Sequence, residues 1–397
     1  MLNKIQGKYV WLIYCMLFAY LSYMTVLSLI SATANTGNTS IERVVFVTIL
    51  IFLLLVLYLF DNVKIVLRKR ICIIPLILLV YFIPLVLMKS ITVLEFTINY
   101  ISISSWIIAF LFGVCLGIKN QRTEKIGKLV SCFMFIILPA SIFIIFQHYI
   151  DYNLLQNATV TDTFFIIVLF TPLSLLLNDK KPRIILFSFL FCLGLISLKR
   201  SIIIAEVLAL AVFYFVSRNR MKKFKESRKI VGSSLFILLS AFAIWFVNSN
   251  DFDFIISRFT GIFEDGGSNR DIIYSNMLFM LSNSNILELL VGRGYNSIHS
   301  TIGIYSHNDF FTLLIDYGFI GFLLYITFIV TLFRFSLKLL KFRHTGDYGE
   351  VAIYTLTLLV LISSSNNLII SPALSSPIML AFGLIMGSAY KIINNGK

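Results

Sequence analysis

Long apolar runs separated by short polar segments make up most of the chain. The runs are about 15 to 22 residues long, and a helix needs roughly 20 residues to cross a bilayer. The pattern therefore predicts an all-α protein, a polytopic transmembrane helix bundle that forms a single integral membrane domain over residues 1–397. About 12 spans are expected, near residues 9–30, 43–60, 71–88, 99–118, 129–147, 162–178, 184–198, 201–217, 230–248, 311–333, 351–369 and 376–393.

Composition excludes a water-soluble domain. Hydrophobic residues make up 58% of the chain and charged residues only 13%, which is more apolar surface than a soluble core can bury. The first apolar run, 9–30, lacks a small-residue cleavage site, so we expect a retained span there and not a removed signal peptide. The five cysteines all lie inside apolar runs without the spacing of metal ligands, which favours small buried side chains.

The basic residues alternate between successive loops and so predict the orientation. One set of loops holds 26 of the 33 Lys and Arg residues, and the positive-inside rule makes that set cytoplasmic. Both termini belong to this set. The net charge of +14 is then mostly a signal of membrane topology, and we expect the bilayer and not a nucleic acid as the partner of these cations.

One loop on the opposite, extracytoplasmic side is large. It covers residues 249–310, between the ninth and tenth predicted spans, and is rich in Gly, Ser, Asn and Asp. A loop of this length in a compact protein is usually functional or disordered. Its aromatic and aliphatic residues favour a folded cap, and two weakly amphipathic stretches within 271–290 are expected to form short helices at the membrane interface.

Two clusters of charge lie on this outer side. The first is the sequence Ser197-Leu198-Lys199-Arg200-Ser201, between two predicted spans. The preceding run of 15 residues covers about 22 Å of a core roughly 30 Å thick, which places Lys199 and Arg200 below the outer surface. A cation there costs roughly 2.5–3.5 kcal/mol, so we expect a bound anion such as a phosphate. The alternative is that both cations reach out to lipid headgroups.

The second cluster lies in the large loop and contains three arginines and a histidine. Arg258 and Arg270 come early in it, and Arg293 lies between Gly292 and Gly294, where the backbone can approach a ligand closely.

His307 lies where the loop meets the next predicted span, beside Asn308 and Asp309. A histidine can accept a proton from a hydroxyl at neutral pH, and a neighbouring carboxylate can orient its ring. The alternative is an interfacial histidine that caps the following helix. No second ligand with suitable spacing accompanies His307, so no metal site is predicted.

These residues together resemble the superfamily of O-antigen polymerases and O-antigen ligases. The shared features are a Gly-x-Gly, a His-Asn about a dozen residues later, and a Gly-x-x-Gly that enters an apolar helix. In this chain they are Gly292, Gly294, His307, Asn308, Gly318 and Gly321. The sequence 197–201 is similar to the Ser-x-x-Arg-Ser hairpin of that superfamily, with Lys199 in place of a small residue, and Arg270 is similar to its early loop arginine.

The resemblance implies a metal-independent, inverting glycosyl transfer without a cofactor. The donor would be an oligosaccharide on undecaprenyl diphosphate, used at the outer face of a bacterial plasma (inner) membrane, facing the periplasm or the cell exterior. Arg200, Lys199, Arg270 and Arg293 would bind the diphosphate and His307 would be the general base. The supporting residues would be Asn308, Asp309, Gly292 and Gly294.

Three functions fit these expectations. The first is a polymerase that joins lipid-linked repeat units into O-antigen or capsule, with or without a chain-length regulator as a partner. The second is a ligase that transfers the glycan to a lipid A core sugar. The third is a flippase or exporter of the same lipid-linked sugars. Transporters commonly have repeat-related halves, which this chain lacks, so an enzyme is favoured.

Overall fold

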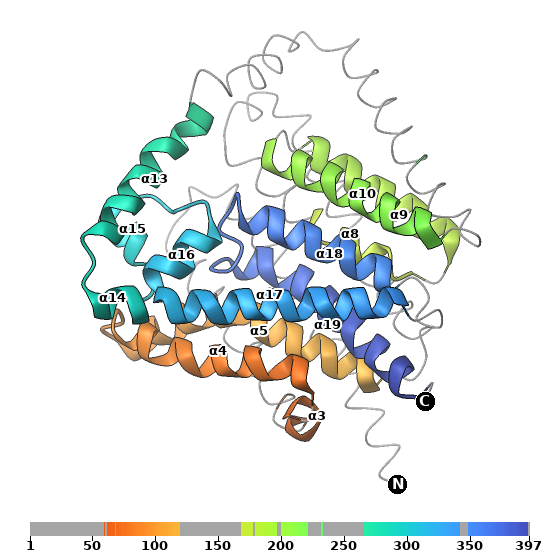
Figure 1. Ribbon diagram of the computed structural model, residues 1–397, viewed down its shortest axis with the longest axis horizontal. Coiled ribbons are helices and arrows are strands. Elements are labelled where there is room, and N and C mark those ends of the chain that lie inside the picture. The colour runs from red at the N-terminus through yellow and green to blue at the C-terminus, as the bar shows by residue number, and fades with distance from the viewer. Residues whose placement is uncertain are drawn as a thin grey trace.

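The fold is helical throughout the part of the chain that can be described. The computed structural model describes residues 59, 62–67, 69–119, 168–177, 179–196, 200–220, 232, 266–341 and 348–395. No strand occurs in these residues (Figure 1). The helices are α3 (Val63–Leu67), α4 (Arg70–Leu87), α5 (Val93–Lys119), α8 (Thr171–Ser174), α9 (Lys180–Ile196), α10 (Arg200–Arg220), α13 (Gly266–Ser282), α14 (Ile286–Val291), α15 (Ser297–Ile302), α16 (Asp309–Asp316), α17 (Gly318–Lys341), α18 (Tyr348–Ser363) and α19 (Pro372–Asn395).

Three of these helices, α4, α5 and α17, are long and apolar enough to cross a membrane. Their outward faces agree with this. α4 exposes Ile77 and Val80, and α17 exposes Phe319 and Phe333. Large apolar side chains in a continuous exposed surface are typical of contact with lipid. The described residues are therefore those of a helical membrane protein, while the total of 12 spans and their orientation stay predictions.

The long helices pack in layers, and the short ones gather at one end. α17 packs on α4 at one side and on α18 at the other, and α10 packs on α18. Helices α13 to α16 lie together at the left-hand end of this bundle in Figure 1. They have a small core of their own, made of Ile273, Met277, Met280, Ile298 and Ile315. We call this group of helices the cap.

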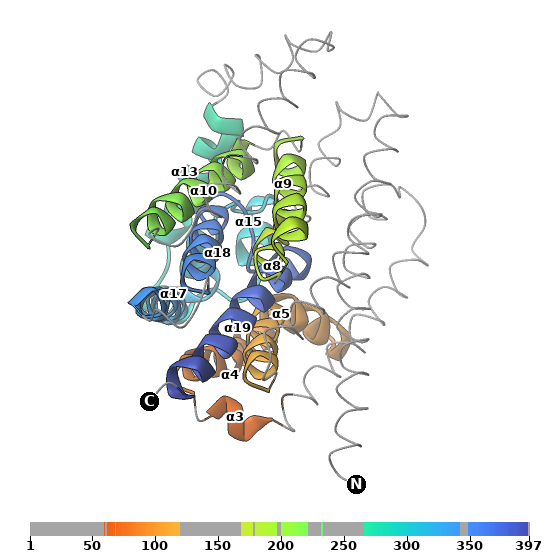
Figure 2. The ribbon, with the colours of Figure 1, turned by 90° about the vertical axis from the view of Figure 1, so that its right-hand side faces the viewer.

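The closest helix pair is α5 with α19, which cross in Figure 2. Each helix carries two glycines four residues apart, Gly113 and Gly117 on α5 and Gly383 and Gly387 on α19. A Cβ atom at Gly113 would lie 2.6 Å from the Leu380 carbonyl oxygen, and one at Gly117 would lie 2.6 Å from the Ser388 nitrogen. The two backbones are therefore in direct contact, which is how small residues spaced by four stabilise helix pairs in membranes.

Five predicted spans coincide with single helices. They are 71–88 with α4, 99–118 with α5, 184–198 with α9, 201–217 with α10 and 376–393 with α19. The predicted spans 9–30 and 129–147, and almost all of 43–60 and 230–248, lie outside the described residues.

The predicted span 311–333 is wrong as one continuous helix. α16 ends at Asp316 and α17 begins at Gly318, whose φ is +65°. A side chain is strained at such a φ, which glycine adopts freely. Any Cβ at Gly318 would also overlap the backbone of Gly292 and Leu290. The apolar pattern runs through this break because both helices bury apolar residues.

In two other predicted spans the described residues include non-helical backbone. Of the span 162–178 the structure describes residues 168–177, which contain the short helix α8, with Pro172 in its first turn. Proline lacks a backbone N–H and disfavours helix in the residue before it. The span predicted at 351–369 stops at Ser363, where the polar run Ser363-Ser364-Ser365-Asn366-Asn367 begins. Residues 364–371 are not helical and connect α18 to α19.

Candidate functional site

A polar connection passes between the cap and the long helices. Segment 364–371 opens with two serines and two asparagines and then enters α19 at Pro372. Irregular backbone at membrane depth is tolerated only where protein buries it or where it lines a cavity. Successive residues of this segment are hydrogen-bonded to three different parts of the chain, and those three parts carry most of the residues predicted above.

The loop before α16 provides the largest share of these bonds. The Ser306 hydroxyl donates to Asn367 Oδ1 (2.8 Å), and Asn308 Nδ2 donates to the Ser364 carbonyl (3.1 Å). The backbone N–H groups of Leu368 and Ile369 donate to the two carboxyl oxygens of Asp309 at 3.2 and 3.1 Å. The residues on both sides of His307 are therefore tied to segment 364–371.

His307 itself lies at a turn in this loop. Its φ is +51°, one of two positive values at non-glycine residues in the described chain, and its side chain is partly exposed. The N-cap of α16 is Asn308, whose Oδ1 accepts from the backbone N–H groups of Phe310 and Phe311. Asn308, and not His307, therefore caps α16, so the alternative that His307 is a helix-capping residue does not apply. Backbone strain at a non-glycine residue that its surroundings hold in place is typical of functional sites.

Arg270 reaches the same segment from the cap. Its Nη2 donates to the Ser365 carbonyl at 2.9 Å. Arg270 lies inside α13, which begins at Gly266. The bond to Ser365 uses one of the five N–H donors of a guanidinium.

The first charged cluster meets the segment from the opposite direction. α10 begins at Arg200, and the next residue, Ser201, accepts a hydrogen bond from Asn366 Nδ2 at 3.2 Å. Lys199 and the rest of the hairpin before it lie outside the described residues. Arg200 is therefore the sequence neighbour of a residue, Ser201, that is hydrogen-bonded to segment 364–371. His307 is in the same position, because both of its neighbours are bonded to that segment.

Arg293 has a different environment. Its Nε donates to Ser284 Oγ (3.1 Å), its Nη2 donates to the Met280 carbonyl (3.0 Å), and the guanidinium pairs with Glu288 at 3.5 Å. Met280 is in the last turn of α13, Ser284 is in the connection after it, and Glu288 is in α14. The contacts favour a structural role for Arg293, holding the turn between these helices, in place of the expected diphosphate contact.

Gly292 and Gly294 lie close to the backbone of other segments of the protein. The N–H groups of Arg293 and Gly294 donate to the carbonyls of Ile315 and Asp316 at 3.0 and 2.9 Å. A side chain at Gly292, where φ is +99°, would overlap the Asp316 carbonyl. Gly292 is thus explained by its crossing with the backbone between α16 and α17, and Gly294, with φ +92°, by its close approach to Lys89 and the Leu85 carbonyl.

Asp309 is fully buried, and burial raises the pKa of its carboxyl to about 8. Hydrogen bonds from the N–H groups of Ile369 and Leu368 and from Ser363 oppose that shift without cancelling it. The described backbone hydrogen bonds of this carboxyl anchor segment 364–371, and its expected role of orienting His307 stays a prediction.

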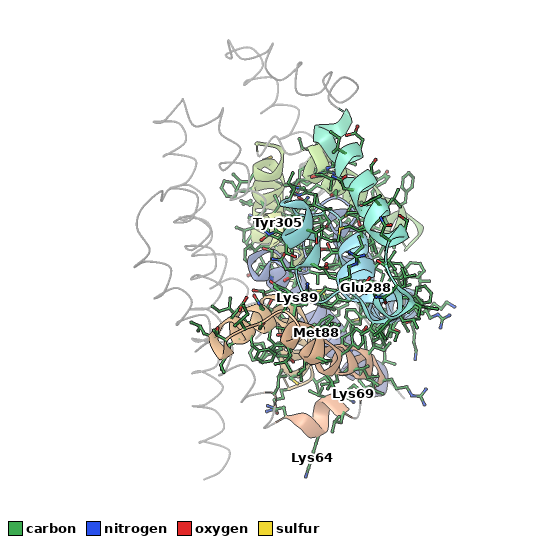
Figure 3. The ribbon with its side chains drawn as sticks, turned by 90° about the vertical axis from the view of Figure 1, so that its left-hand side faces the viewer. Lys64, Lys69, Met88, Lys89, Glu288 and Tyr305 are labelled. Carbon is green, nitrogen blue, oxygen red and sulfur yellow. The ribbon has the colours of Figure 1, made fainter. Side chains whose placement is uncertain are left out.

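Sequence reasoning missed segment 364–371, Ser306 and Lys89. The signal for the segment was five consecutive polar residues inside an apolar run. The side chain of Lys89 lies against Gly294, and Lys89 faces the viewer with Tyr305 at the cap end of the molecule (Figure 3).

Within the described ranges, no three His, Cys, Asp or Glu side chains are grouped so as to hold a metal ion. Neither a protein-family model nor a curated protein sequence matches this chain. The resemblance to the polymerase and ligase superfamily therefore depends on the sequence motifs quoted above.

Proposed function

We propose that this protein is a glycosyltransferase of the plasma membrane that polymerises oligosaccharide repeat units carried on undecaprenyl diphosphate into a surface polysaccharide. The observation that carries the proposal is the convergence on segment 364–371. Ser201 beside Arg200, Arg270, and both neighbours of His307 all bond to residues 364–369. The residues beside the proposed base and beside the proposed cation Arg200, and the side chain of Arg270, thereby meet at one segment of an otherwise apolar protein.

The chemistry matches these groups. An acceptor hydroxyl attacks the anomeric carbon of the donor sugar from the face opposite the diphosphate. The bond from carbon to the diphosphate oxygen breaks, and the hydroxyl proton goes to His307. Negative charge grows on the leaving diphosphate, so cations stabilise the transition state more than the ground state. Arg270 and Arg200 are the cations that we assign to this task, together with Lys199, which precedes Arg200 in the sequence.

The test uses the purified protein in detergent. The substrate is the lipid-linked repeat unit that accumulates in cells lacking this protein, supplied with neither metal nor nucleotide. We expect a ladder of products on a gel from the wild type and from His344→Ala, a control on the predicted cytoplasmic side, and none from His307→Ala. Arg200→Ala and Arg270→Ala are expected to weaken both donor binding and turnover.

Other outcomes select the other candidates. Product that forms only after a lipid A core acceptor is added indicates a ligase. Movement of the lipid-linked sugar across a liposome bilayer without new glycosidic bonds indicates an exporter. A normal ladder from His307→Ala removes the base assignment, and unchanged donor affinity in Arg200→Ala returns that arginine to contact with lipid headgroups.

A further inference from the structure

An exposed aromatic pair lies next to His307 in the chain. The rings of His299 and Tyr305 are stacked, with centroids 4.3 Å apart and planes 25° from parallel. His299 is on α15, and Gly303, with φ +80°, ends that helix and turns the chain back. His299 therefore supports one face of the Tyr305 ring, while 43% of Tyr305 remains exposed.

The backbone around this pair is fixed. Ser306 is only 2% exposed, and its hydroxyl is bonded to Asn367 and within hydrogen-bonding distance of Thr312. Tyr305 and His307 flank this anchored residue. Two residues of chain span at most about 7 Å, so the Cα atoms of Tyr305 and His307 lie within about that distance of each other.

The surroundings favour a sugar over a lipid. The neighbouring surface exposes Ser300 and Thr301 of α15 together with one aliphatic residue, Ile304, whereas the faces of α4 and α17 that we assign to lipid are aliphatic and aromatic. One face of a pyranose ring presents C–H groups with partial positive charge, and the face of an aromatic ring carries partial negative charge. The hydroxyls at the rim of the same sugar need polar neighbours, which this surface offers.

We propose that Tyr305, supported by His299, is the stacking platform of the acceptor-sugar subsite and holds the acceptor hydroxyl near His307. This inference rests on the proposed function and adds the residue that selects and positions the acceptor. Tyr305 is a binding residue in this assignment, and the proton transfer remains with His307.

A binding experiment tests it without turnover. The probe is the oligosaccharide released by mild acid from the accumulated lipid-linked repeat unit, observed by saturation-transfer NMR with detergent-purified protein. We expect transfer to the sugar C–H protons with the wild type, Tyr305→Phe and His307→Ala. Tyr305→Ala is expected to weaken binding at least about tenfold, as loss of one stacking contact does for bases, with an unchanged melting temperature.

The control is Phe279→Ala, which removes an aromatic ring that is 71% exposed on α13. It should bind the oligosaccharide like the wild type. Equal binding by Tyr305→Ala, or no binding by the wild type, overturns the inference. If Tyr305→Ala binds the free oligosaccharide normally but transfers the lipid-linked acceptor poorly, the ring anchors lipid headgroups, which also overturns it.

The two proposals can fail separately. A product ladder from the wild type with unchanged acceptor affinity in Tyr305→Ala removes the platform and leaves the polymerase. Oligosaccharide binding that depends on Tyr305, without any ladder, removes the polymerase and leaves a sugar-binding site.

Discussion

Arg270 and Arg293 are arginines of the same predicted loop, but their guanidinium groups have different partners. Arg270 makes one described hydrogen bond, to the Ser365 carbonyl. Arg293 bonds to Met280 and Ser284 and pairs with Glu288. An arginine that binds a diphosphate needs N–H donors that other protein groups do not already use. The hydrogen-bond partners of Arg270 and Arg293, and not their sequence positions, therefore distinguish their roles.

We expect Arg293→Ala to destabilise the cap. Each charged hydrogen bond contributes about 1.5–3 kcal/mol, so the melting temperature in detergent should fall by several degrees while donor affinity in the surviving fold stays within about twofold. Glu288→Gln removes only the ion pair, which is partly exposed and worth up to about 1 kcal/mol, and should cost less. A normal melting temperature with lost donor binding in Arg293→Ala would restore its diphosphate role.

The buried Asp309 makes stability depend on pH. Its folded pKa of about 8 lies above the ordinary value of 3.8, so the folded state holds a proton that the unfolded state has released between these values. The stabilisation is therefore complete below about pH 4 and is lost as pH rises toward 8. We expect the melting temperature to fall between pH 5 and pH 8 in the wild type.

Asp309→Asn is the matched variant for that slope. Asn cannot ionise, so the fall with pH should flatten. Its amide NH₂ cannot accept the hydrogen bond that one carboxyl oxygen accepts, so the variant should also be less stable at pH 5. The test is to measure the melting temperatures of both proteins at four pH values. If the melting temperature falls equally with pH in both, another group causes the pH dependence of stability.

At the scale of the helices, the contact of α5 with α19 is the one that depends most directly on glycine. A Cβ at Gly383 or Gly387 would overlap the carbonyl of Phe110 or Val114. Gly383→Leu should therefore separate the two helices and greatly reduce the fraction of protein that elutes as a single species from a sizing column. The control is Gly232→Leu, since nothing lies within 4 Å of a Cβ there. Equal yields from both variants would contradict this account.

Sequence predicted helices well where one apolar run forms one helix, as in α4, α5 and α10, because burial in lipid requires about 20 apolar residues in succession. It failed where tertiary contacts break a run. Gly318 was known as part of a motif, but only its crossing with Gly292 explains why α16 and α17 are separate. The polar run 363–367 was visible in the sequence, yet residues of this kind also occur within membrane helices, so the pattern alone did not predict a connection.

For the molecule as a whole, the candidate residues were predictable as two clusters but not as one site. The hairpin before α10 and the loop around His307 are about a hundred residues apart in sequence, and neither contains a signal that points to residues 364–369. The connection arises from hydrogen bonds of Ser201, Arg270 and Asn308 to that segment. Only the packing of α10 on α18 and of the cap on α17 brings them together.

This arrangement predicts that Asn366 couples the two clusters. Its Nδ2 donates to Ser201 beside Arg200, so Asn366→Ala should let the start of α10 shift relative to His307 and lower turnover by about 10- to 100-fold, since small misplacements of reacting groups cost about that much. Ser364→Ala is the matched control. The segment uses the Ser364 carbonyl, while its hydroxyl bonds only to the Leu361 carbonyl one turn earlier, so turnover should stay near that of the wild type.

A double-mutant cycle separates coupling from general damage to the fold. Ser201→Ala removes the same hydrogen bond from the other side, so it should lower turnover about as much as Asn366→Ala, and the two changes together should cost little more than either alone. Melting temperatures should stay similar in all three variants, because a single neutral hydrogen bond contributes only about 1 kcal/mol. Additive losses, or wild-type turnover in Asn366→Ala, would mean that segment 364–371 holds the cap in place without aligning the arginine of α10 with His307.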